Sequence, residues 1–172
     1  MTDFIDFALS RYSVRKYSPK PVEDEKIRKI LEAAKIAPTA KNNQPQKIYV
    51  VKSKAARDRL TKVTPCTFDA PVVFVIGYYN DRTTPGKLFE GYQFGDTDAA
   101  IVCSHMMLEA HDLGLGSCWV GWFVEKEVKD ALNIPDNISV RSLLPVGYAA
   151  PDSVPSERHL EYRDQETYIE EL

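Results

Sequence analysis

Apolar side chains recur along this chain at two spacings, at every third or fourth residue in some segments and at nearly every residue in others. The helical spacing follows an acidic stretch at 23–25 and stops before Pro38, which predicts a helix. The continuous apolar run 71–76 predicts a central strand that is covered on both faces. In chain order, the expected elements are a helix at 23–36, a strand at 47–52, a short helix with Ala56, Leu60 and Val63, a strand at 71–76, a long loop at 79–95, a helix at 96–113, a short strand at 117–120, a helix with Val124, Val128 and Leu132, and a strand at 140–148.

This order predicts an α+β fold, with helices on both faces of a mixed central sheet. The helix expected at 96–113 is apolar around most of its circumference, so we expect it in a core or an oligomer interface. The length of 172 residues indicates a single domain, 1–172, with an extended C-terminal arm at about 149–172 where periodicity is weak.

Composition excludes several classes of function. The chain is 44% hydrophobic and 27% charged with a net charge of −3, which gives no electrostatic footprint for nucleic acid or an anionic membrane. The longest nearly apolar run, 70–79, is too short for a membrane-spanning helix, and the acidic N-terminal residues do not resemble a secretory signal. We therefore expect a cytoplasmic protein.

Three widely spaced cysteines, Cys66, Cys103 and Cys118, indicate neither a disulfide framework nor a zinc site, and they fit a reducing compartment. His105 and His111 are six residues apart and do not share a helical face, so no metal site is expected.

The candidate chemistry begins with Arg11, Ser13 and Arg15. An extended backbone points alternate residues to one side, so two guanidinium groups and a hydroxyl would line a site for an anion such as phosphate. The alternative for this segment by itself is an ordinary solvated basic loop. A second segment, 37–45, contains Pro38, Thr39, Asn42, Gln44 and Pro45, which together predict a rigid polar turn whose amides can recognise the edge of a heteroaromatic ring.

Together the two segments closely resemble the FMN-dependent nitroreductase family. Its N-terminal signature has Arg-x-Ser-x-Arg/Lys-x-Phe/Tyr, followed about one helix later by Ala-Pro-Ser-x-x-Asn-x-Gln-Pro-Trp. Thr39 stands here in place of the serine and Gln46 in place of the tryptophan. The segment 113–121 is similar to the family's Gly-Leu-Gly segment, and 144–148 followed by Arg158 is similar to its closing strand and phosphate-binding tail.

The resemblance implies a nitroreductase-like homodimer with FMN at the subunit interface. Arg11, Ser13 and Arg158 would hold the phosphate and ribityl oxygens, and Arg15 would lie near the N1/C2 carbonyl edge of the ring. The backbone of Val120 and Gly121 would lie near N5, and the turn at 38–42 would reach the flavin of the other subunit. The implied cofactor-binding set is Arg11, Tyr12, Ser13, Arg15, Pro38, Thr39, Ala40, Asn42, Gln44, Cys118, Trp119, Val120, Gly121 and Arg158.

The implied activity is transfer of a hydride from NADH or NADPH through FMN to a small nitroaromatic or quinone acceptor, in a ping-pong cycle. Because the flavin carries the redox chemistry, no catalytic side chain is expected. Two alternatives stay open: another reaction on the same scaffold, such as oxidation, dehalogenation or flavin fragmentation, and an FMN-binding module without turnover.

Other features limit these inferences. The Gly114–Gly116 pair is not a dinucleotide fingerprint, because a helix precedes it and a strand follows. The side chains of Trp119 and Val120 are expected chiefly to pack in the core. Many relatives have a basic residue where Ser156 stands, and others have Asn and Lys where this chain has 64–66, so donors near the pyrimidine edge of the ring are in question.

Overall fold

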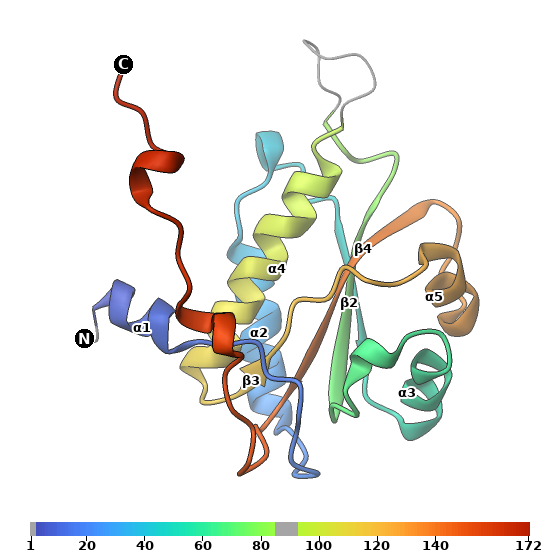
Figure 1. Ribbon diagram of the computed structural model, residues 1–172. Coiled ribbons are helices and arrows are strands. Elements are labelled where there is room, and N and C mark those ends of the chain that lie inside the picture. Colours follow the sequence, from blue (N-terminus) through green and yellow to red (C-terminus); the bar gives the residue numbers. More distant parts are fainter. Residues whose placement is uncertain (1–2, 85–92) are drawn as a thin grey trace.

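A four-stranded sheet forms the centre of the computed structural model, which describes residues 3–84 and 93–172 (Figure 1). The strand order is β1-β2-β4-β3. The strands are β1 (Gln46–Val51), β2 (Val72–Tyr79), β3 (Gly116–Ser117) and β4 (Ile138–Gly147).

The α+β class is confirmed, but the three ladders of the sheet are all antiparallel. Within residues 3–84 and 93–172, parallel pairing is limited to the isolated bridge between Ser13 and Ser117, so the expected mixed character is confined there to the N-terminal segment. The reason lies in the connections: β1 ends at Val51 opposite Val73 at the start of β2, so the chain re-enters the sheet at the end where it left. A parallel pair would need a crossover along the full strand.

Helices cover both faces of this sheet, as expected (Figure 1). Side chains of β2 alternate between two cores: Phe74 and Ile76 pack in the core with α2 and α4, and Val73 and Val75 pack in the core with α3 and α5. All four of these side chains are fully buried, which explains the continuous apolar run. The helices are α1 (Phe4–Ser10), α2 (Asp24–Ile36), α3 (Lys54–Thr61), α4 (Gly95–Asp112) and α5 (Glu125–Leu132).

Helix α4 lies within one residue of its expected bounds. It ends where Gly114 adopts a φ of +72° and donates its backbone N–H to His111 O. The strand expected at 117–120 is shorter than predicted: β3 stops at Ser117, and pairing resumes only at the bridge between Val120 and Leu143. Part of the loop expected at 79–95 is strand, since β2 extends to Tyr79, and its centre at 85–92 lies outside the described residues.

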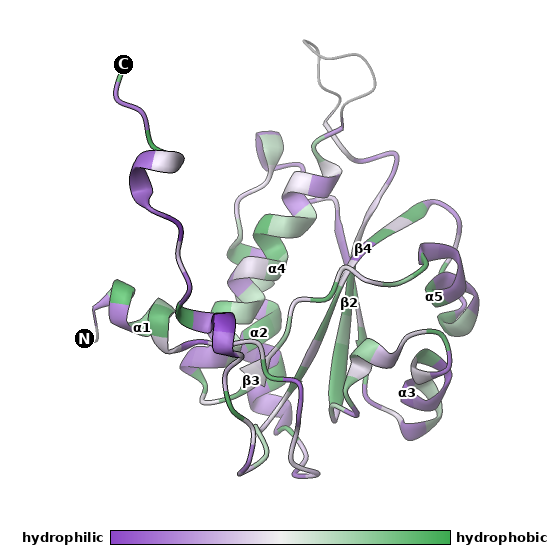
Figure 2. Cartoon of the chain, viewed as in Figure 1, coloured by the Kyte–Doolittle hydropathy of each residue, from purple (hydrophilic) through white to green (hydrophobic). Residues whose placement is uncertain are grey.

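The C-terminal arm extends away from the sheet (Figure 1). Beyond Gly147 it contains two short 3-10 helices, η3 (Glu157–Leu160) and η4 (Gln165–Thr167). The arm is mostly hydrophilic, with a few short hydrophobic parts (Figure 2), and several large apolar or aromatic side chains on it are exposed. They are Val154, Leu160, Tyr162, Tyr168 and Ile169. None of the described helices is long and apolar enough to cross a membrane.

Helix α1 contacts the rest of the chain through the C-terminal end of α4. The rings of Phe7 and His111 lie 4.9 Å apart, and Ser10 Oγ is 2.7 Å from His111 Nε2. Burial lowers the pKa of His111, and the nearby Arg11 guanidinium lowers it further. The residues just before Arg11 are therefore held by a histidine that favours its neutral form.

The close approach of the N-terminal segment to β3 predicts the effect of one substitution. A Cβ at Gly116 would lie 2.5 Å from Val14 Cγ2, and Val14 is buried with a stiff, β-branched side chain. We expect Gly116→Ala to lower the free energy of unfolding by about 1–3 kcal/mol in urea titrations. Gly121→Ala is the matched control, because no atom lies within 4 Å of its added Cβ, and its stability should stay within about 0.5 kcal/mol. Equal stabilities for the two variants would contradict this packing.

His111 predicts a pH dependence of stability. Its folded-state pKa is below the ordinary value of 6.5, so the unfolded chain takes up the proton first as the pH falls. Stability should therefore decrease as the pH falls below about 6.5, and His111→Gln should reduce that decrease between about pH 7 and 5. Carboxylates with lowered pKa, such as Asp24, lose their contribution only at lower pH. Urea midpoints across this range test the difference, and identical slopes in both proteins would rule the effect out.

Candidate functional site

The segment Arg11–Tyr17 leaves α1 in an extended conformation, as its alternating pattern predicts. Val14 donates its backbone N–H to Ser117 O at 3.0 Å and is buried on the sheet side. Because successive side chains of an extended segment alternate, Ser13 and Arg15 lie on the side opposite Val14. The expected side-by-side placement of Arg11, Ser13 and Arg15 is supported by their common neighbour Cys118, whose pKa each of them lowers.

The guanidinium groups of this segment lack acidic partners. Among residues 3–84 and 93–172, neither Arg11, Arg15 nor Arg158 forms an ion pair with a carboxylate. Arg15 Nη1 donates only to the backbone oxygen of Ser13, at 3.3 Å. Lys16, by contrast, pairs with Asp152. Three cations without a carboxylate partner are available to an anionic ligand.

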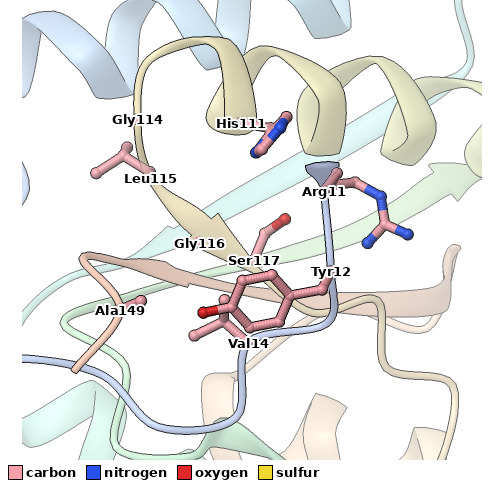
Figure 3. Close-up of a pocket in the computed structure, with 9 residues that line it drawn as sticks. All are labelled: Arg11, Tyr12, Val14, His111, Gly114, Leu115, Gly116, Ser117 and Ala149. Carbon is pink, nitrogen blue, oxygen red and sulfur yellow. The ribbon is translucent and has the colours of Figure 1, made fainter. Parts of the chain in front are cut away.

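A cavity of about 200 Å³ lies between this segment and the end of α4 (Figure 3). Ser117 Oγ is buried, and it has no hydrogen-bond partner within the described part of the chain. Sequence reasoning gave neither Ser117 nor His111 a role in the site, although Ser117 lies in the matched segment 113–121, because both reach the cavity only through the fold. The cavity is lined by Arg11, Tyr12, Val14, His111, Gly114, Leu115, Gly116, Ser117 and Ala149.

Arg158 belongs to the same end of the molecule. It lies on η3, where the neighbouring His159 Nε2 is 3.1 Å from the backbone oxygen of Leu9. The ring of His159 also lies 6.3 Å from that of Tyr12, whose hydroxyl donates to the backbone oxygen of Ser153. The structure therefore brings the short helix of Arg158 against the Arg11 segment, from nearly 150 residues away in sequence.

The segment 118–121 presents two different faces. Val120 exchanges both backbone hydrogen bonds with Leu143 at 2.9 Å, and the side chains of Cys118 and Val120 are buried in the core with α3 and α5. The expected core packing is confirmed for Val120 and is wrong for Trp119, whose side chain is 38% exposed and lies in neither core. Gly121 borders open space. Trp119 and Gly121 thus form the accessible face of this segment.

Two buried groups beside Arg15 stay neutral. Burial raises the pKa of the Cys118 thiol, against the opposing effect of Arg15. Burial also raises the pKa of Tyr17, whose hydroxyl donates to the backbone oxygen of Pro145 at 3.0 Å. The basic segment therefore faces an uncharged surface, and Cys118 is not a thiolate nucleophile at neutral pH.

A second cavity, of about 370 Å³, lies beyond Gly121 between the loop at 63–65 and the segment 122–124. Thr64 Oγ1 accepts the backbone N–H of Cys66 and donates to the backbone oxygen of Trp122, which joins the two sides. Trp122 is 80% exposed, and no charged residue lines this cavity. Sequence reasoning did not identify Trp122, although a large exposed aromatic side chain next to a cavity commonly marks a binding surface.

The polar turn of the second sequence motif lies elsewhere. Pro38 and Thr39 lead into η1 (Ala40–Asn42), and Gln44 donates its backbone N–H to Thr39 Oγ1 at 3.0 Å. Gln44 Nε2 also donates to Asn42 Oδ1 at 3.1 Å. The turn is attached to the N-terminal end of α4, where Ala40 N donates to Asp98 Oδ1 at 2.8 Å. The polar turn predicted from the sequence is present, and its rigidity stays a prediction.

The two motifs lie at opposite ends of one helix (Figure 1). The turn contacts α4 at Asp98, whereas the basic segment follows Ser10, which contacts α4 at His111. Thirteen residues of α-helix separate these contacts, about 20 Å along the axis. Within one chain the fold therefore brings Arg11, Ser13 and Arg15 near Cys118 and docks the short helix of Arg158 against the start of that segment, but it keeps the turn apart from them.

Comparison with known proteins identifies the family of the chain. The model of the nitroreductase family matches residues 8–68 and 64–148. A candidate NADH dehydrogenase/NAD(P)H nitroreductase of Methanothermobacter thermautotrophicus is 30% identical over 156 residues, which cover 86% of this chain and 78% of the relative. A nitroreductase family protein from Clostridium difficile 630 is 35% identical with a TM-score of 0.91, and 99% of each chain is covered.

A second solved structure, of an FMN-dependent nitroreductase from Clostridium difficile R20291, is 27% identical with a TM-score of 0.76, covering 96% of this chain and 97% of the other. The family match includes the basic segment, the polar turn and β4, the last strand in sequence. Because the family model matches most of the chain and the fold is shared with a solved family member along 99% of it, this protein belongs to the nitroreductase family.

Proposed function

We propose that this protein is an FMN-dependent oxidoreductase that oxidises NADH or NADPH and reduces a small nitroaromatic or quinone acceptor in a ping-pong cycle. The observation that carries the proposal is the set of arginines at this end of the molecule, Arg11, Arg15 and Arg158, which have no carboxylate partner among the described residues. Arg11 also lines the cavity that contains the unpartnered Ser117 hydroxyl. The family membership and the FMN-dependent relative support the same conclusion.

These residues fit a flavin mononucleotide. Arg11, Ser13 and Arg158 supply cations and a hydroxyl suited to one phosphate and its ribityl chain. Trp119 and Gly121, on the accessible face of their segment, offer an apolar surface and free backbone for the flat ring. This cluster is of a size to hold one phosphate, which favours FMN over a dinucleotide.

When bound, the flavin supplies the redox chemistry by taking a hydride from the nicotinamide and passing it to the acceptor. The protein needs no nucleophile, in agreement with the neutral Cys118 thiol. Arg15 is exposed in the single chain and has no carboxylate partner among the described residues, so its positive charge would be available to stabilise negative charge on a bound ligand. Its role is thus electrostatic.

The second cavity suits the acceptor. Its described lining is uncharged and mostly apolar, with Thr64 as the polar residue, and Trp122 presents an exposed aromatic face for a flat ring. Trp122 directly follows Gly121 in the chain, so an acceptor there would lie close in sequence to the segment that we propose beside the flavin.

We further propose that the functional unit is a homodimer in which the turn with Pro38, Thr39, Ala40, Asn42 and Gln44 completes the flavin site of the other subunit. The separation of about 20 Å along α4 supports this arrangement, because the turn is distant from the basic segment of its own chain. Exposed apolar groups support it as well: α1 has no buried residue, and Phe4 and Ile5 are more than 60% exposed.

The outer side of α4 also agrees with a dimer. Ala100, Ser104 and Leu108 are only half-buried on this otherwise apolar helix, so a second copy could cover them. All three cysteines are free, which fits the reducing cytoplasm that we propose as its location.

The first test is the cofactor itself. The purified protein should be yellow and should release FMN, not FAD, on heating, and it should elute at about twice 19.5 kDa. It should also oxidise NADH or NADPH faster than free FMN does, which distinguishes an enzyme from a binding module. A colourless protein that takes up no added FMN would refute the proposed function.

Two arginines with the same charge but different proposed roles give a sharper test. Arg158→Ala removes a phosphate partner, so FMN affinity should fall roughly 10- to 150-fold, while the reduction potential of the bound flavin stays the same. Fluorescence titration of the flavin-free protein measures the affinity.

Arg15→Met should act mainly on the potential. If the lost charge contributes about 1.5–3 kcal/mol to the reduced form, the two-electron potential should drop by about 30–65 mV. Affinity for oxidised FMN should change less than in Arg158→Ala. An unchanged potential with weaker binding would instead place Arg15 at the phosphate.

A further inference from the structure

The polar turn is conformationally unfavourable by itself. Lys41, Asn42 and Gln44 have φ values of 54°, 56° and 48°, in the left-handed region that L residues avoid. The hydrogen bonds from Gln44 to Thr39 and Asn42 lie within the turn and do not attach it to the body of the protein. Three such residues in one short turn persist only where surrounding structure holds them.

Two buried side chains supply that support. Asp98, which is 1% exposed, accepts the backbone N–H of Ala40 at 2.8 Å through Oδ1. Thr84 is 5% exposed, and its hydroxyl donates to the backbone oxygen of Ala40 at 3.3 Å and accepts from Asn43 Nδ2 at 2.7 Å. Both polar groups of Ala40 are therefore bonded to buried side chains outside the turn.

The carboxylate of Asp98 is costly to bury. Oδ2 has no hydrogen-bond partner within the described residues, and no cation forms an ion pair with this side chain there. Its position in the first turn of α4 compensates in part, because the helix dipole favours a negative charge at that end. An apolar residue would fill the core at less cost, so the bond to Ala40 is the feature that this placement provides.

We propose that Asp98, together with Thr84, is a positioning residue that fixes the polar turn in the conformation in which it contacts FMN in the partner subunit. The inference rests on the proposed function. Asp98 itself does not touch the flavin. It acts through the backbone of Ala40. Because Asp98 belongs to α4, the packing of α4 in the core fixes where the polar turn lies, and this turn is the part of the site that each chain supplies to its partner.

The test compares Asp98→Ala with Asp98→Asn, which keeps an oxygen that can accept from Ala40. Asp96→Ala is the matched control: Asp96 lies in the same helical turn, but it accepts from Tyr78 Oη and Arg141 on the sheet side. Two quantities are measured for each protein: FMN affinity, and the rate at which trypsin cleaves the flavin-free protein after Lys41.

Asp98→Ala should weaken FMN binding about 10- to 100-fold and accelerate cleavage after Lys41 by a similar factor. Asp98→Asn should stay within about threefold of the original protein in both measurements. Asp96→Ala should lower thermal stability without either change. If Asp98→Ala does not fold, Thr84→Val removes the second support at nearly constant volume and should accelerate cleavage after Lys41.

Unchanged affinity and cleavage in the Asp98 and Thr84 variants would overturn the proposal. Equal losses in Asp98→Ala and Asp96→Ala would also overturn it, because they would indicate a general loss of stability. A failure of the proposed function is distinguishable: the original protein would then bind no FMN, while cleavage after Lys41 would still report whether Asp98 holds the turn.

Discussion

Helix α4 sets the distance between the two halves of the candidate site. Its N-terminal end bonds the polar turn through Asp98, and its C-terminal end contacts the basic segment through His111. Between them, Val102 and Met106 are fully buried against the sheet, so the helix cannot bend or shift without opening the core. The helix therefore keeps its two ends at a fixed separation, and the distance between the turn and the basic segment within one chain is the reason to propose that two chains complete each site.

The same core explains which parts of the fold can be predicted from the sequence. The apolar run at 71–76 and the periodic segments at 23–36 and 96–113 each carry their pattern locally, and all three appear as expected elements. The strand at 116–117 carries no such pattern. It is short and depends on Gly116 packing against Val14, about a hundred residues away in sequence. Strand direction also depends on how connections return to the sheet, which no local pattern encodes.

The candidate site divides in the same way. The alternating pattern correctly predicted the extended course of Arg11, Ser13 and Arg15. Val14, between Ser13 and Arg15, is buried, and this determines which side chains of the segment face away from the sheet. Spacing in the sequence could not show that Arg158 docks beside this segment, or that Ser117, His111 and Trp122 border cavities. Asp98 resembled an ordinary acid at a helix start. Only the fold gives it a role, since its partner Ala40 is far away in sequence.

Charge gives the site its selectivity. The chain carries a net charge of −3, yet Arg11, Arg15 and Arg158 have no carboxylate partners in the described structure, while many lysines pair with acids on the surface. The basic cluster is thus a local feature against an acidic background, and the neutral Cys118 and Tyr17 beside it add no opposing charge. These conditions favour one small anionic cofactor and give no general affinity for polyanions.

The central claim is that each flavin site takes its basic half from one chain and its polar turn from another. The most direct measurement is FMN titration of a purified mixed dimer, in which one chain carries Arg11→Ala with Arg158→Ala and the other carries Asn42→Ala with Gln44→Ala. Either doubly substituted chain, paired with itself, should bind FMN weakly at both sites. The mixed dimer should regain native affinity in about half of its sites, because one site combines the two intact halves. A mixed dimer that binds no better than its two parents would contradict the account.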